Sequence, residues 1–235
     1  MIVEGRPSAI ILRSPSGPAP GGSARYIKEA AMKYQHIVFD LDGTLMDTER
    51  AILPALRDTL LARTGKHYPE EELTFALGIT GADALKRLGV DDIDGVLALW
   101  VDNMRRYQDA VTLFSGVEEV LKALRDSGAT LGIVTSQTYE EFDHGFVPLG
   151  VSGYFQVAIR AEDTQEHKPA PAPLLKYMKL SGARPEEVLY VGDSVYDSRC
   201  AQAAGVDFAL ALWGTHDPTI SAVHRLQSPA ELLSL

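Results

Sequence analysis

The chain has 235 residues, of which 46% are hydrophobic, and its 32 acidic and 22 basic side chains give a net charge of −10. So acidic a chain excludes general binding to nucleic acid, which needs clustered positive charge. No apolar run approaches the roughly 18 residues that a membrane span needs. The single cysteine, Cys200, excludes an internal disulfide. We therefore expect a cytoplasmic globular protein that acts away from membranes.

The first thirty residues differ in composition from the rest. Residues 6–23 are rich in proline, glycine and serine, a composition that favours a flexible segment. The apolar run at 9–12 is too short for the core of a secretory signal. We expect residues 1–31 to be a flexible N-terminal extension, with the functional domain starting at Met32.

Short apolar runs alternate with helical patterns in the remainder of the chain. The runs predict buried strands at residues 37–41, 131–134, 157–159, 188–191 and 208–212. Apolar residues at helical spacing predict helices over residues 116–125, 171–180 and 195–204. This alternation predicts an α/β fold, with a Rossmann-like parallel sheet and helices on both of its faces.

One long insertion interrupts the alternation. Between the first strand and the helix at residue 116 lie about seventy residues without a strand signal, far more than an ordinary connection. Helical patterns cover residues 49–63, 70–77, 82–88 and 93–107. We interpret residues 47–111 as a small helical cap, and residues 32–46 and 112–235 as the core. Asp47 is expected to cap the first cap helix. The loop 78–83 is either a lid over the site or an ordinary turn.

Polar side chains follow the predicted strands where each one ends. They are Asp40, Asp42, Gly43 and Thr44 after the first strand, Thr135 and Ser136 after the second, Lys168 after the third, and Asp193 and Asp197 after the fourth. Ligands of open parallel sheets bind beyond the carboxyl ends of the strands. These residues should therefore gather at one edge of the sheet.

The chemistry of this set is that of phosphoryl transfer. Three carboxylates, those of Asp40, Asp42 and Asp193, would repel one another unless a cation neutralised them. Oxygen ligands of this kind suit Mg²⁺. Lys168 and the hydroxyl of Thr135 supply donors for phosphate oxygens. A metal cluster that faces an anion-binding cluster predicts catalysis by positioning and by charge stabilisation.

Four motifs in order carry a family resemblance. They are DLDGTLMDT at residues 40–48, the threonine after the second strand, the Lys-Pro pair at 168–169 and GDSVYD at 192–197. Together they resemble the haloacid-dehalogenase-like (HAD) superfamily. Segments such as SGVEEVLKALRDSGATLGIVTS and HKPAPAPLL are similar to its phosphoglycolate-phosphatase-like branch. The resemblance covers roughly residues 34 to 235 and implies a Mg²⁺-dependent phosphatase whose partner is a small phosphorylated metabolite.

The resemblance also implies roles for individual residues. Asp40 would be the nucleophile that forms an aspartyl-phosphate, and Asp42 the general acid and then the general base. Mg²⁺ would be held by the Asp40 carboxylate, the backbone carbonyl of Asp42 and the carboxylate of Asp193. Lys168 would orient Asp40. The residues expected to bind the phosphoryl group are Gly43, Thr135, Ser136 and Lys168, and those expected to support the site are Thr44 and Asp197.

The sequence motifs are compatible with several functions. The expected substrate is a phosphomonoester, either phosphoglycolate-like or a sugar phosphate. A pyrophosphatase or nucleotidase is an alternative, because the motifs bind only the phosphoryl group. A phosphomutase is disfavoured because residues 78–85, GITGADAL, lack the basic residues of the mutase type. Asp42 argues against a dehalogenase, and the intact carboxylates argue against a non-catalytic binding protein. We expect Cys200, Trp100 and Trp213 to be packing residues.

Overall fold

The computed structural model describes residues 33–235, so the predicted extension at 1–31 lies outside the described residues. Its centre is a six-stranded parallel sheet of order β5-β4-β1-β6-β7-β8. The strands are β1 (His36–Phe39), β4 (Thr130–Val134), β5 (Val157–Ile159), β6 (Val188–Gly192), β7 (Asp207–Ala211) and β8 (His224–Leu226). The five predicted strands are confirmed, and β8 is an addition. Within residues 33–235, no helix is long and apolar enough to cross a membrane.

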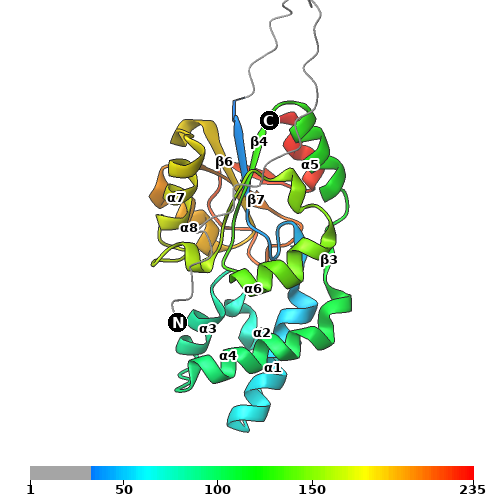
Figure 1. Ribbon diagram of the computed structural model, residues 1–235, viewed down its shortest axis with the longest axis vertical. Coiled ribbons are helices and arrows are strands. Elements are labelled where there is room, and N and C mark those ends of the chain that lie inside the picture. The colour runs from blue at the N-terminus through cyan, green and yellow to red at the C-terminus, as the bar shows by residue number, and fades with distance from the viewer. Residues whose placement is uncertain (1–32) are drawn as a thin grey trace, which may run out of the picture.

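Helices cover both faces of this sheet, as predicted. Helix α5 (Val117–Asp126) lies on one face, and helices α7 (Ala172–Ser181) and α8 (Val195–Ala204) lie on the other (Figure 1). Alternate side chains of β1 enter the two separate cores, because successive strand residues point to opposite faces. Phe39 lies in the same core as Leu121 of α5, whereas Val38 lies in the other core with Leu174 of α7.

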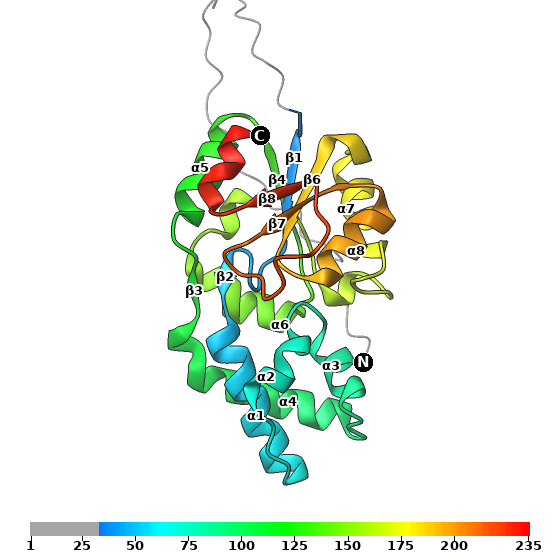
Figure 2. The same ribbon diagram turned by 180° about the vertical axis from the view of Figure 1, so that it is seen from behind.

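The C-terminal segment completes the face on which α5 lies. Figure 2 shows the last turn, Pro229–Ser234, beside α5 after the chain leaves β8. Leu232 of that turn and Leu226 of β8 are buried in the same core as α5. Cys200 is buried without a disulfide in the opposite core, which confirms that it is a packing residue.

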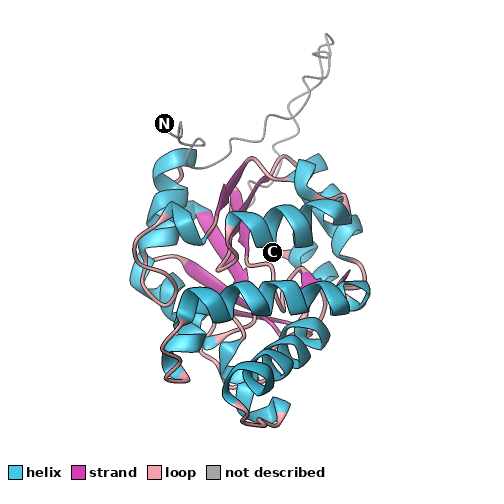
Figure 3. Ribbon diagram, turned by 60° about the horizontal axis from the view of Figure 1, so that its bottom comes forward, coloured by secondary structure: helices cyan, strands magenta, loops and turns pink. Residues whose placement is uncertain are grey.

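The insertion forms a helical region at one end of the molecule (Figure 1). It contains α1 (Glu49–Thr64), α2 (Glu70–Leu73), α3 (Gly81–Arg87) and α4 (Ile93–Met104). Figure 3, turned to bring this end forward, shows these helices in front of the sheet. They have an apolar core of their own that includes Leu56, Leu85 and Val96. We call this region the cap.

The chain enters and leaves the cap through a pair of very short strands. Strand β2 (Met46–Asp47) pairs antiparallel with β3 (Thr112–Leu113). The prediction that Asp47 caps the first cap helix is wrong, because Asp47 lies in β2 and Thr48 takes the N-cap position. The division into core and cap at residues 47 and 111 agrees with this pairing and stays a prediction.

A second helical segment follows β4 and was not predicted. Helix α6 (Tyr139–Glu141) continues into a π-helical turn, Phe142–Phe146, and a 3₁₀ turn, Val147–Leu149. A capping box starts it, in which Thr138 and Glu141 satisfy each other's backbone N–H groups. The segment lies between the sheet and the cap (Figure 1). It thereby brings acidic side chains next to the predicted site.

Candidate active site

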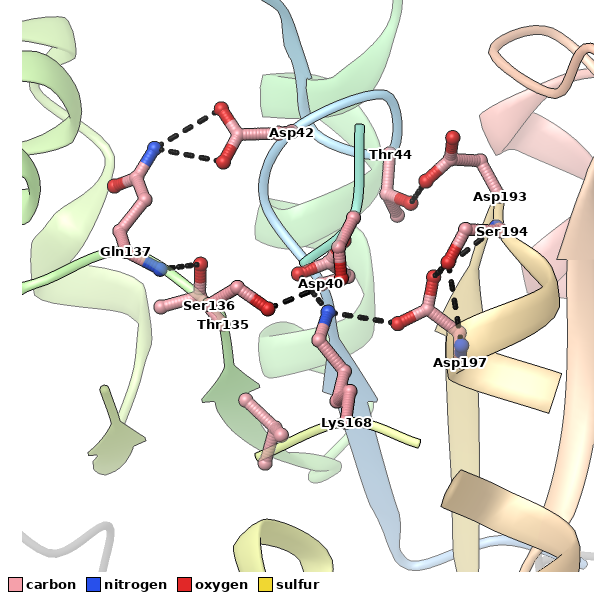
Figure 4. Close-up of polar contacts among 12 residues, drawn as sticks. Asp40, Asp42, Thr44, Thr135, Ser136, Gln137, Lys168, Asp193, Ser194 and Asp197 are labelled. Atoms are coloured by element: carbon pink, nitrogen blue, oxygen red, sulfur yellow. Dashed lines mark hydrogen bonds and ion pairs between the residues drawn. The ribbon is translucent and has the colours of Figure 1, made fainter. Parts of the chain in front are cut away.

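The polar residues at the strand ends meet at one edge of the sheet, as predicted (Figure 4). Asp40 follows β1, Thr135 follows β4 and Asp193 follows β6. Because β1 lies between β4 and β6, its end has the other two beside it. Lys168 reaches the same place from the loop before α7.

Lys168 is the centre of a buried ionic network. Its Nζ lies 2.8 Å from Asp40 Oδ1 and 2.8 Å from Asp197 Oδ1. Burial alone would lower the pKa of Lys168, but the carboxylates of Asp197 and Asp40 outweigh it and raise that pKa. The ammonium group therefore stays charged and holds one oxygen of Asp40 in a fixed position.

The other oxygen of Asp40 is free. Asp40 Oδ2 is buried, and no hydrogen-bond partner for it exists among residues 33–235. Burial raises the pKa of the Asp40 carboxyl to about 8, and Asp197 and Asp42 add to this rise against the opposing charge of Lys168. A buried carboxylate oxygen without a partner is costly, so this atom needs a cation or a reacting group beside it.

Three buried carboxylates could hold a metal ion here. Oxygens of Asp40, Asp193 and Asp197 lie within 4.8 Å of one another. Burial, followed by repulsion from Asp197 and Asp40, raises the pKa of Asp193 well above its ordinary value. A divalent cation would relieve this repulsion, so this set of carboxylate donors fits Mg²⁺.

Asp197 already has protein partners on both of its oxygens. Its Oδ1 accepts from Lys168 and from the hydroxyl of Tyr190 at 2.9 Å, and its Oδ2 accepts from the backbone N–H and hydroxyl of Ser194. Asp40 and Asp193 are therefore better placed as metal ligands. Asp197 holds Lys168, which agrees with its expected supporting role. The sequence did not reveal the contribution of Tyr190, because a tyrosine in a buried strand carries no signal of where its hydroxyl lies.

The side chain of Asp42 lies outside the carboxylate group that we expected it to join. Both of its oxygens accept a hydrogen bond from Gln137 Nε2, each at 3.0 Å (Figure 4). Burial raises the pKa of Asp42, while hydrogen bonds from Thr48 and Gln137 oppose that rise. The prediction that its backbone carbonyl binds Mg²⁺ concerns a different atom and stays a prediction. The sequence does not reveal this contact of Gln137, because the direction of a side chain in a loop leaves no pattern in the sequence.

The residues after β4 point in different directions. Thr135 Oγ1 accepts a hydrogen bond from the backbone N–H of Gln137 at 3.1 Å. Ser136 donates its hydroxyl to the carbonyl of Gly78 in the cap loop, at 3.1 Å. The structure thus ties Ser136 to the cap rather than leaving it free, and its expected contact with phosphate stays a prediction.

Gly43 allows a close approach of the chain to Asp193. Its φ is +79°, and a Cβ placed there would lie 2.4 Å from Asp193 Oδ2. Thr44 donates its hydroxyl to Asp193 Oδ1 at 3.3 Å, and its carbonyl accepts from Trp213 Nε1 at 2.9 Å. Gly43, Thr44 and Trp213 therefore fix Asp193, which supports the structural role expected of Thr44.

The cap loop, residues 78–83, docks onto the core beside the site. Besides the Gly78 contact, the carboxylate of Asp83 lies 3.5 Å from the imidazole of His167, next to Lys168. Just beyond the loop, Arg87 donates to the hydroxyl of Tyr196 at 3.2 Å. Of the two interpretations left open for this loop, its docking favours the lid.

This chain is similar in sequence to known proteins. The family model described as haloacid dehalogenase-like hydrolase matches residues 37–211. A protein from Caldanaerobacter subterraneus subsp. tengcongensis, named "Putative pyrophosphatase PpaX", is 34% identical over 77% of this chain and 83% of its own. The pyrophosphatase PpaX of Bacillus pumilus is 29% identical over 85% and 94%.

This chain is also similar to solved structures. A protein from Lactobacillus plantarum, described as a "putative phosphoglycolate phosphatase", superposes with a TM-score of 0.79 at 35% identity. The match covers 86% of this chain and 99% of that one. The resemblance seen in the four motifs is thereby confirmed, and the expected fold with it. This chain belongs to the haloacid dehalogenase-like hydrolase family.

Proposed function

We propose that this chain is a Mg²⁺-dependent phosphohydrolase in which Asp40 is transiently phosphorylated. The observation that carries the proposal is the asymmetry of Asp40, whose Oδ1 is held by Lys168 at 2.8 Å while its buried Oδ2 has no partner among the described residues. A carboxylate with one oxygen fixed and the other free is preorganised for attack on phosphorus.

In the proposed reaction, Asp40 Oδ2 forms a bond to phosphorus and the bond from phosphorus to the leaving oxygen breaks. Asp42 gives its proton to that oxygen, then takes a proton from the water that hydrolyses the aspartyl-phosphate. Lys168 and Thr135 bind the phosphoryl oxygens. Bound Mg²⁺, held by Asp40 and Asp193, would supply the charge that shields the nucleophile from the incoming phosphate.

Two substrate classes have support. Similarity to the relatives named pyrophosphatases favours inorganic pyrophosphate over the phosphoglycolate-like ester expected from the sequence. A small phosphomonoester is the second candidate, because a mostly apolar cavity adjoins Asp40 and Asp42. Such a cavity suits a carbon-based leaving group better than a second phosphate.

The test is phosphate release from pyrophosphate, 2-phosphoglycolate and a series of phosphomonoesters, with and without Mg²⁺. We expect Mg²⁺-dependent release that Asp40→Asn abolishes while the variant keeps the circular dichroism spectrum of the parent. Release that survives in Asp40→Asn contradicts the nucleophile. A parent protein that binds phosphate esters and releases no phosphate from any of them is a binding protein or a mutase.

A further inference from the structure

A cavity of about 140 Å³ lies between the cap and the core. The carboxylates of Asp40 and Asp42 border it on the core side. Most of its wall is apolar and comes from the cap and the segment that leads into it. Its apolar lining includes Ile52, Ile79, Trp100, Val101 and Met104. Any group still bonded to a phosphorus atom at Asp40 has this space beside it.

The volume of the cavity indicates what size of group fits inside it. An engineered cavity of about 150 Å³ lined by aliphatic and aromatic side chains stays dry and binds benzene. The cap cavity is of similar volume but partly open to solvent, so a group of about one six-membered ring fits inside it. Apolar walls offer water few hydrogen bonds, and the transfer of an apolar group from water into such a cavity is favourable in free energy.

The charges around the cavity oppose an anionic leaving group. Glu140 and Glu141 of α6 join Asp40 and Asp42 in its lining. Among the described residues of the lining, the guanidinium of Arg105 is the permanent cation. It is largely exposed and already lies 3.3 Å from Asp102 and 3.9 Å from Glu140. A second phosphate would lose its hydration without gaining a free cation, which is unfavourable.

One polar atom of the wall lacks a partner. Trp100 is 7% exposed, and its Nε1 finds no hydrogen-bond acceptor among residues 33–235. The Cε3–Cζ3 edge of the indole faces Gly81, with the atoms of Trp100 3.3 and 3.6 Å from a Cβ placed there, so Nε1 lies on the opposite edge. An unsatisfied buried donor costs about 1–3 kcal/mol, and a ligand acceptor would remove that cost.

We propose that the cap cavity binds the leaving group of the substrate, and that this group is a compact apolar alcohol with one hydrogen-bond acceptor for Trp100 Nε1. The inference rests on the proposed phosphohydrolase function and names its substrate class. The ester bond from phosphorus to the alcohol oxygen breaks, Asp42 supplies the proton, and the neutral alcohol stays in the cavity until the cap releases it.

The first experiment compares kcat/KM for butyl phosphate, benzyl phosphate, 2-phosphoglycolate and pyrophosphate. We expect benzyl phosphate to exceed both pyrophosphate and phosphoglycolate by at least about tenfold, which corresponds to ~1.4 kcal/mol. A higher kcat/KM for either anionic substrate overturns the inference and leaves the phosphohydrolase standing. Absence of release from all four, or release that persists in Asp40→Asn, overturns the proposed function instead.

The second experiment places a cation in the wall through Met104→Lys, with Ile79→Lys as an independent variant in case the first does not fold. Each should raise the ratio of kcat/KM for pyrophosphate over benzyl phosphate by about tenfold. The matched control is Val96→Ala, a buried α4 residue that does not line the cavity. An unchanged ratio in folded lysine variants contradicts the location of the leaving group.

The third experiment isolates the Trp100 donor. The three pyridylmethyl phosphates have the shape of benzyl phosphate and place one ring nitrogen at each position. We expect kcat/KM for one isomer to exceed that for benzyl phosphate by about tenfold, and we expect Trp100→Phe to bring the ratio of these two kcat/KM values down to about one. An advantage that survives Trp100→Phe, or the lack of any favoured isomer, overturns the role of Trp100.

Discussion

At the scale of the residue, Lys168 holds two buried carboxylates together, one from the strand end and one from α8. Lys168→Met should therefore leave Asp40 and Asp197 without their shared partner. We expect a fall in kcat of about 10²–10³-fold and, without Mg²⁺, a loss of about 3–5 kcal/mol in the free energy of unfolding. Phosphate release and urea denaturation measure the two effects.

The control for that variant is Lys122→Met, whose ammonium pairs with Asp126 on the exposed surface of α5. Exposed pairs of this kind contribute little to stability, because water and salt screen them, and this pair lies away from the site. Equal losses in the two variants would contradict a special role for Lys168.

Gly43 offers a second prediction at this scale. Gly43→Ala puts a Cβ against Asp193 in addition to the strain of a positive φ, whereas Gly65→Ala has a similar φ of +69° and nothing within 4 Å of its Cβ. Both variants should lose about 1 kcal/mol or more of stability from the backbone. Only Gly43→Ala should raise the Mg²⁺ concentration needed for half-maximal activity. The same Mg²⁺ dependence in both would refute the packing of Gly43 on Asp193.

The sequence predicted which polar residues come together, because they follow predicted strands of one parallel sheet. Asp40, Thr135, Lys168 and Asp193 follow buried strands, and topology alone brings such positions together. It did not predict that Gln137 holds Asp42 or that Ser136 contacts the cap, because those contacts depend on side-chain directions in irregular loops.

At the scale of the element, a polar cluster at one end of the sheet links the residues before β1 to the start of β7. Asp207, at the start of β7, accepts from the Tyr34 hydroxyl at 2.7 Å and from Lys33 at 3.0 Å. Tyr34, with a smaller contribution from Lys33, holds the pKa of Asp207 below its ordinary value of 3.8. A lowered pKa in the folded state stabilises above the ordinary value, and this stabilisation is lost as pH falls through the lowered one.

Asp207→Asn should therefore be less stable than the parent at pH 7 by about 0.2–1 kcal/mol, since the carboxylate is partly exposed. The difference should shrink as pH falls below 3.8. Denaturant unfolding from pH 7 to pH 2.5 measures it, with Asp91→Asn, an exposed cap residue, as the control. A difference that stays constant across this range would show that the ionised carboxylate is not what stabilises the sheet.

Elements with strong periodicity were predictable and short ones were not. The amphipathic pattern of α5 and the apolar runs of β1 and β6 need only local information. The pair β2 and β3 has two residues in each strand, too few for any pattern. The segment after β4 changes from α to π to 3₁₀ geometry within eleven residues, so no single period describes it.

At the scale of the whole molecule, the cap has an apolar core separate from the two cores that flank the sheet. Leu85→Ala, at a fully buried cap position, should cost about 2–5 kcal/mol of local stability. Because the cap has its own apolar core, we expect it to open as a unit, so hydrogen exchange should accelerate in α1, α3 and α4 and stay unchanged in β1, β4 and β6. Equal acceleration in the sheet would show that cap and core unfold together.

The cap was foreseeable from the long stretch without strand signals, but its docking on the core was not. The contacts of Ser136 with Gly78 and of His167 with Asp83 join residues 58 and 84 positions apart. Each is a single polar contact between irregular segments, and hydrophobic periodicity says nothing about such pairs.

The antiparallel pairing of β2 with β3 has a consequence for how the protein can evolve. Residues directly opposite in such a pair have Cα atoms about 4.5–5.5 Å apart, so the chain leaves the core and comes back at almost the same point, with Met46 facing Leu113. A segment whose two ends are adjacent can be lengthened, shortened or replaced without moving any core strand. The sheet edge that carries the candidate site and the cap that covers it can therefore diverge independently. We expect a different insertion joined at Met46 and Leu113 to leave the fold of the sheet intact.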